Sequence, residues 1–156
     1  MSRSLARVER ALAEAGIAAR ILQMPGETRT AAQAAAAAGC ALDQIVKSIV
    51  FAGTEDGHIR LFLTAGGNRV DPARASALAG TPLGRADADL VRQETGFAIG
   101  GVAPVGHRTP VRAWFDPRLM AFDTVWAAAG TPRHIFAAAP ADLVRAGGAT
   151  VAAFTA

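Results

Sequence analysis

The chain contains a single lysine, Lys47, which lies in its most apolar stretch, residues 44–51 (QIVKSIVF). Lys and Arg together number 16, and all the others are Arg. An arginine guanidinium is a wide planar fork, whereas a lysine ammonium is a compact charge with three rotatable donors. A lone Lys therefore indicates a narrow pocket in which an ammonium points at one oxygen. The alternative is a lysine on an edge strand that extends its charged end into solvent.

A glycine-rich segment, residues 95–107 (TGFAIGGVAPVGH), is the second feature that could do chemistry. Its spacing differs from the dinucleotide-binding pattern G-x-G-x-x-G, and no Lys follows as in a phosphate-binding Walker A loop. The paired glycines, Gly100 and Gly101, would let a ligand approach bare backbone N–H groups, which can hold a carbonyl or an oxyanion. The same cluster could equally be an ordinary turn between a helix and a strand.

The remaining candidate side chains do not form the pattern of a catalytic or metal centre. His58, His107 and His134 lack paired metal spacing such as H-E-x-x-H, so we expect them to be surface or structural residues. The single Cys40 excludes an internal disulfide and a cysteine-cluster metal site, and is expected to be a small buried apolar side chain. We therefore predict no metal and no cofactor.

Lys47 falls in the first of two β-branched stretches, residues 45–52 and 58–64, which flank a turn around Asp56-Gly57 and are predicted to form a β-hairpin. Further strands are expected at 18–24, 111–115, 122–128 and 134–139. Cap and stop signals predict helices from Ser4 to Gly16, Thr30 to Gly39, Asp71 to Gly80, Asp87 to Gly96 and Pro140 to Gly147, with Ser4 as an N-cap. Interleaved helices and hairpin-linked strands indicate one α/β domain over residues 1–156, with a mixed sheet flanked by helices.

Charge and hydropathy narrow the possible partners and locations. No apolar run approaches the length of a membrane span, and the N-terminus MSRSLARVER lacks the apolar core of a secretory signal, so we expect a cytoplasmic protein without membrane contact. The net charge of +3 permits contact with a polyanion. Because the arginines are scattered rather than gathered in a stripe, we do not expect sequence-specific DNA binding.

Lys47 and the glycine segment, taken together, are typical of a known protein family. Residues 45–51 (IVKSIVF), 68–71 (NRVD), 85–107 (RADADLVRQETGFAIGGVAPVGH) and 140–146 (PADLVRA) resemble the YbaK/ProX family of aminoacyl-tRNA editing domains. The resemblance spans nearly the whole chain. It implies a mixed α/β domain with a barrel-like sheet. It also implies a free-standing deacylase that acts in trans, hydrolysing the ester between a wrong amino acid and the 3′ end of its tRNA.

The resemblance also implies roles for particular residues. Hydrolysis in the family is largely assisted by a ribose hydroxyl of the substrate, so no catalytic triad is needed. Lys47 would bind the tRNA terminus or the aminoacyl carbonyl, with Ser48 as a neighbouring hydrogen-bond donor. The backbone at Gly100 and Gly101 would hold the ester carbonyl, and Pro104 would stiffen that loop.

The resemblance also implies which residues contact the substrate. Ile99 and His134 are carried over as substrate-binding residues, with Ile135 as the alternative to His134 if the register differs by one. A small amino acid such as Ala, Ser, Thr or Cys is expected, on tRNA-Pro or a related tRNA. Two other functions stay open: a tRNA- or nucleic-acid-binding module without chemistry, and a partner domain that associates with an aminoacyl-tRNA synthetase.

Overall fold

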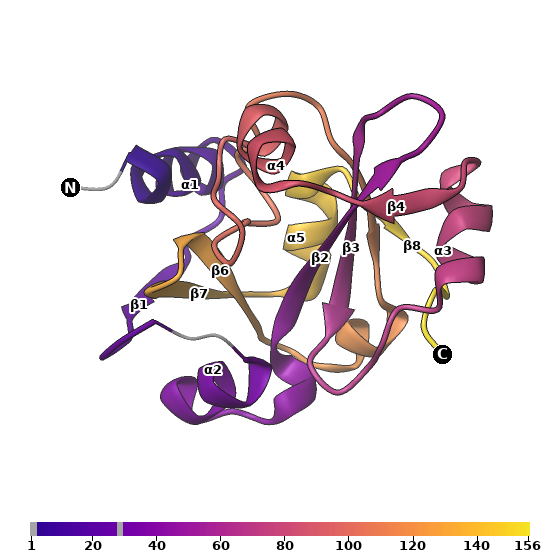
Figure 1. Cartoon of the computed structure of the whole chain (residues 1–156). Helices are drawn as coiled ribbons and strands as arrows, with labels where there is room; N and C mark the ends of the chain where they lie inside the picture. Colours follow the sequence, from indigo (N-terminus) through magenta and orange to yellow (C-terminus); the bar gives the residue numbers. More distant parts are fainter. Residues whose placement is uncertain (1–2, 28–29) are drawn as a thin grey trace.

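The computed structural model describes residues 3–27 and 30–156, whose strands form two sheets (Figure 1). The larger sheet has the order β4-β2-β3-β5-β8, built from β2 (Val46–Gly53), β3 (Ile59–Ala65), β4 (Leu83–Arg85), β5 (Arg112–Phe115) and β8 (Thr150–Val151). The smaller sheet has the order β1-β7-β6, built from β1 (Arg20–Gln23), β6 (Val125–Thr131) and β7 (His134–Ala138). A parallel bridge between Ile45 and Trp126 connects the two sheets.

The predicted α/β class and mixed sheet are confirmed. The β3–β5 and β5–β8 pairs are parallel, whereas β2 pairs antiparallel with β3 and with β4. Within the described ranges the strands do not close into one barrel, because the sheets meet at a single bridge. The predicted hairpin is also confirmed: β2 and β3 pair along their length, with Val46 opposite Ala65.

Strand β3 is the centre of the larger sheet, and all of its residues are buried. Its side chains alternate between two apolar clusters. Leu61 and Leu63 enter the main core, and Phe62 enters a smaller cluster where it stacks on Trp114 at 4.9 Å between ring centroids. A strand buried on both faces needs a nearly continuous apolar sequence, which explains why residues 59–65 (IRLFLTA) are mostly apolar.

The helices are α1 (Arg3–Glu14), α2 (Ala31–Ala38), α3 (Pro72–Ala79), α4 (Ala88–Thr95) and α5 (Pro140–Gly147), with short 3₁₀ turns η1 (Leu42–Gln44) and η2 (Pro117–Ala121). The alanine-rich helix α2 begins at a capping box between Thr30 and Gln33, as the cap signal predicts. The prediction of Ser4 as an N-cap is wrong, because α1 already includes Arg3. None of the described helices is long and apolar enough to cross a bilayer.

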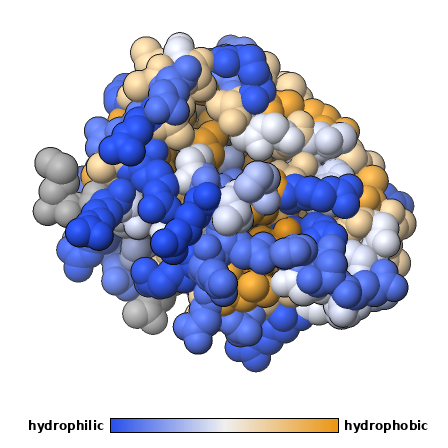
Figure 2. Space-filling model, turned by 90° about the horizontal axis from the view of Figure 1, so that it is seen from above, coloured by the Kyte–Doolittle hydropathy of each residue, from blue (hydrophilic) through white to orange (hydrophobic). Residues whose placement is uncertain are grey.

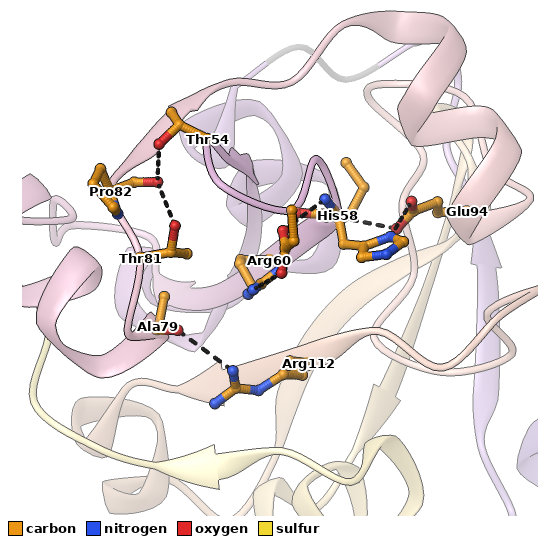
Figure 3. A network of polar contacts seen from close by, with 10 residues as sticks. Thr54, His58, Arg60, Ala79, Thr81, Pro82, Glu94 and Arg112 are labelled. Atoms are coloured by element: carbon orange, nitrogen blue, oxygen red, sulfur yellow. Dashed lines mark hydrogen bonds and ion pairs between the residues drawn. The ribbon is translucent and has the colours of Figure 1, made fainter.

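A polar network fixes the tip of the β2–β3 hairpin to its neighbours (Figure 3). Arg60 is buried in β3, and its Nη2 donates to Asp56 Oδ2 at 2.6 Å. Glu94, on α4, accepts hydrogen bonds from Ile59 N at 3.0 Å and bonds to His58 Nδ1 at 2.9 Å. These contacts fasten α4 to the hairpin, and α4 leads directly into the glycine-rich segment.

The Asp56–Arg60 pair predicts how stability depends on pH. The hydrogen bond from Arg60 lowers the pKa of Asp56 from its ordinary value of 3.8 to about 2. Because the folded-state pKa is depressed, the pair stabilises the protein above pH 3.8 and this contribution is lost as the pH falls towards about 2. We expect Asp56→Asn to lower the Tm at neutral pH, and the difference from the wild type to vanish near pH 2. Circular dichroism melting curves would measure this.

Glu55→Gln is the matched control, since it removes the same charge from an exposed neighbour. A loss of Tm in Asp56→Asn that does not depend on pH would show that the ion pair is not the cause.

Candidate functional site

A pocket of about 720 Å³ lies between residues 45–50, at the start of β2, and residues 126–128 of β6. Most of its wall is apolar, with Trp126 and Ile135 on the side of the smaller sheet. The glycine segment contributes another wall through Ile99, Gly100 and Val102. The polar or charged side chains that line it are Glu27, Thr30, Lys47 and Ser48.

The pocket borders an open edge of β2. On one side β2 pairs with β3 along its length, but on the other it pairs with β4 only at Phe51–Gly53. No described strand pairs with residues 47–50 on that side. Gly53 N donates to His58 O at 2.9 Å, so by alternation the peptide groups of Ser48 and Val50 point away from β3, towards the pocket. A ligand can therefore bond to strand backbone there, a feature that no sequence signal revealed.

Lys47 supplies the positive charge of the site. Its ammonium group, on a half-buried side chain, donates one hydrogen bond within the described part of the chain, to Asn68 O at 2.5 Å. Since an ammonium has three donors, two remain for a ligand. Burial and the nearby Arg69 lower the pKa of Lys47, and Asp116 and Asp43 oppose that shift.

The buried carboxylate of Asp116 fixes the loop whose Asn68 carbonyl accepts the hydrogen bond from Lys47. Asp116 is 2% exposed, and its Oδ2 accepts hydrogen bonds from Asn68 Nδ2 at 2.9 Å and from Ala65 N at 3.0 Å. Its Oδ1 accepts from Arg118 N at 2.9 Å. Asp116 thus fixes Asn68, whose carbonyl orients Lys47. Sequence reasoning missed this role, because Asp116-Pro117 indicates only a turn.

The two predicted glycines have different positions. Gly101 N donates to Ala98 O at 3.0 Å, which closes a turn with Gly100 at φ +92°, a conformation that favours glycine. Gly100 lines the pocket, and no described residue accepts a hydrogen bond from its N–H. Gly101 faces away, where an added Cβ would lie 2.9 Å from Thr131 Cα. The Gly100 amide is therefore the one that a ligand can reach, since that of Gly101 is already used.

The other predicted substrate-binding residues are placed around this turn. Ser48 Oγ donates to Val102 O at 2.7 Å, so the hydroxyl fastens the glycine segment to β2 and keeps only its lone pairs for a ligand. Ile99 is 57% exposed and contributes to the pocket wall. Pro104 is buried outside the pocket, with its carbonyl beside Gly147 at the end of α5.

The structure places His134 and Ile135 differently. Ile135 lines the pocket and is buried in a cluster with Ile45 and Trp126. His134 is not part of the pocket wall, and its Nδ1 bonds to Thr131 Oγ1 at 2.7 Å. Neighbouring residues of a strand point to opposite faces. A shift of one residue in the assignment therefore replaces a side chain of the pocket wall with one that points away from the pocket.

The three histidines lie in separate environments. His58 bonds to Glu94, His107 Nε2 lies 2.7 Å from Ala103 O, and His134 is bonded at the β6–β7 turn. In the part of the chain that the structure describes, no group of three His, Cys, Asp or Glu side chains is placed to hold a metal ion.

The fold and the site define a small α/β domain built around an apolar pocket that carries one lysine, an open strand edge and a glycine turn. The chain belongs to the aminoacyl-tRNA editing domain family, whose sequence profile matches residues 25–146. This result confirms the resemblance drawn from Lys47 and the glycine segment.

The chain is also similar to solved structures and to a bacterial protein. A solved structure described as a candidate trans-editing enzyme for prolyl-tRNA synthetase is 46% identical, with a TM-score of 0.91 over 100% of this chain and 99% of that one. The hypothetical protein APE2540 is 31% identical, with a TM-score of 0.86 over 96% of this chain and 99% of that one. The uncharacterized protein YwhH of Bacillus subtilis (strain 168) is 28% identical over 123 residues, which are 79% of this chain and 78% of YwhH.

The contacts of Asp116 predict the effect of changing Asn68. Asn68→Ala removes one of the two donors to the buried Oδ2. We expect the free energy of unfolding to fall by about 1–3 kcal/mol, the usual cost of leaving a buried acceptor underbonded. Urea unfolding measures this, with Arg69→Ala at the exposed neighbouring position as the control. Equal effects of the two substitutions would contradict the role of Asp116 in holding this loop.

Proposed function

We propose that the protein is a trans-acting aminoacyl-tRNA deacylase that releases a small amino acid from the 3′ end of a mischarged tRNA. The observation that carries the proposal is that Lys47 and Gly100, from distant parts of the chain, line one pocket of an editing domain. One offers a charged donor and the other an unused amide. The apolar wall around them suits a small side chain next to an ester.

The geometry supports separate roles for Lys47 and Gly100. We assign the two remaining donors of Lys47 to a phosphate or ribose oxygen of the terminal adenosine. We assign the amide of Gly100 to the ester carbonyl, whose oxygen becomes negative when water attacks. A neighbouring ribose hydroxyl directs that water. The bond between the carbonyl carbon and the ribose oxygen then breaks, which gives the free amino acid and a ribose hydroxyl.

The proposed substrate is a small amino acid on tRNA-Pro or a related tRNA. The structure described as a candidate trans-editing enzyme for prolyl-tRNA synthetase supports this choice. An apolar pocket rejects an added hydroxyl only weakly, so Ala, Ser, Thr and Cys are all to be tested. We expect action in the cytoplasm, where charged tRNA is found, with or without association with a synthetase.

Two Lys47 variants test the proposal directly. Lys47→Ala removes the charged donor, and Lys47→Arg keeps the charge but replaces the compact ammonium with a wide fork. We expect both to lower kcat/KM about 10–100-fold, the loss of a charge-assisted hydrogen bond. Release of labelled amino acid from tRNA-Pro charged with Ala, Ser, Thr or Cys measures this.

Arg74→Ala, which removes an exposed charge on α3, is the control. Unchanged turnover in both Lys47 variants would exclude the assigned role. Tight binding of every charged tRNA without turnover by the wild type would favour the non-catalytic binding module.

The two glycines predict contrasting defects. Gly100→Ala adds a methyl group in open space at φ +92°, so we expect about 1–2 kcal/mol of backbone strain and a turnover loss of about 10-fold or more. Gly101→Ala presses a methyl group on the Thr131 backbone, so we expect mainly a loss of stability, of about 1–3 kcal/mol. Urea unfolding and the deacylation assay, run on both variants, separate the two effects. If both variants lost the same turnover for each kcal/mol of unfolding free energy lost, the assignment of the ester carbonyl to the Gly100 amide would be contradicted.

A further inference from the structure

A second pocket, of about 340 Å³, lies between α1 and the end of the glycine segment. Its wall is strongly cationic. It is lined by Arg7, Arg10, Ala11, Glu14, Gly106, His107 and Arg108. Among the described residues, three arginines and one acidic residue, Glu14, line this pocket.

These arginines are not engaged by acidic partners. Neither Arg7, Arg10 nor Arg108 forms an ion pair with any acidic side chain in residues 3–27 or 30–156. The Nη1 atom of Arg7 is buried and has no hydrogen-bond partner among residues 3–27 and 30–156. A buried donor without an acceptor is costly, and an anion that reaches it recovers that cost.

The neighbouring residues hold Arg7 in place and leave the charge to the arginines. The Arg7 guanidinium lies over the Phe97 ring at 5.9 Å and against Gly96, where a side chain would collide with it. His107 bonds to Ala103 O, and its burial lowers its pKa, so it stays neutral at neutral pH. The positive charge of this pocket therefore comes from its three arginines.

The two pockets share the glycine segment. Residues Ile99 and Gly100 face the first pocket, and Gly106 to Arg108 face the second, only a few residues later in the same chain segment. Figure 2, seen from above, shows hydrophilic side chains gathered over the left part of this face, the side on which α1 lies in Figure 1. Arg7 lies over Phe97, two residues before Ile99, so the cationic pocket adjoins the same glycine segment that forms a wall of the first pocket.

We propose that Arg7, Arg10 and Arg108 form a phosphate-binding site for the backbone of the substrate tRNA near its 3′ end. The proposal rests on the proposed function, because it takes an aminoacyl-tRNA as the ligand. Guanidinium groups bind phosphate oxygens through paired N–H donors, and such contacts fix position without reading sequence. This site gives the enzyme affinity for the RNA, while the first pocket binds the aminoacyl group and sets amino-acid specificity.

The test uses the double variant Arg10→Gln/Arg108→Gln, since both side chains are exposed and Arg7 stays in its packed position. Arg74→Gln/Arg112→Gln removes the same charge from exposed positions that line neither pocket. Binding of uncharged tRNA is measured by fluorescence anisotropy over a range of salt concentrations. This readout does not depend on catalysis, so it separates failure of this site from failure of the deacylase proposal.

We expect the pocket variant to bind tRNA about 10-fold or more weakly, with a salt dependence reduced by about two phosphate contacts, and the control to bind like the wild type. In deacylation, KM for aminoacyl-tRNA rises, while hydrolysis of an aminoacyl ester of adenosine alone is unchanged. Equal weakening in both double variants would overturn the proposal, as would unchanged tRNA binding. Calorimetric binding of inorganic phosphate that is lost in the pocket variant while tRNA affinity is kept would assign the site to a small anion and overturn it too.

Discussion

The site depends on the unequal lengths of the strands on either side of β2. Strand β3 is buried on both faces and pairs with β2 along its length, which fixes β2 firmly. On the opposite side, β4 has only three residues, so β2 loses its partner where the two sheets part. The pocket occupies that space, and every other feature of the site is arranged around it.

The position of Lys47 shows how the fold tolerates a charge in an apolar strand. Moving an ammonium out of water is unfavourable, and the lowered pKa of Lys47 reflects this. The carbonyl of Asn68 offsets part of the cost, and the buried Asp116 keeps that carbonyl in place. The lysine is thus held by the Asn68 carbonyl while it lines the pocket.

Much of the fold could be predicted because its signals are local. Asp71-Pro72 and Thr30 begin helices, and alternating apolar residues mark the hairpin. Lys47 and Gly100 could be selected as site residues since a lone lysine and a glycine turn are visible in sequence.

The features that could not be predicted from the sequence depend on contacts between residues that are distant in the chain. Ser48 was expected to donate to a ligand, yet it donates to Val102, and the orientation of its side chain follows from tertiary packing. Gly101 and Pro104 fall near the pocket in sequence but face other neighbours. Asp116-Pro117 indicates only a turn in the sequence, because two of the three hydrogen bonds of Asp116 come from Ala65 and Asn68, which meet it only in the folded chain.

The unpaired stretch of β2 has a consequence for the protein as a molecule in a crowded cell. Free strand edges invite strands from other molecules to add to them, which is a common route to aggregation. Here residues 47–50 line the pocket between the glycine turn and the smaller sheet, so a foreign strand would have to enter the pocket to pair with them. The recess that forms the pocket therefore also limits how another molecule could extend this sheet.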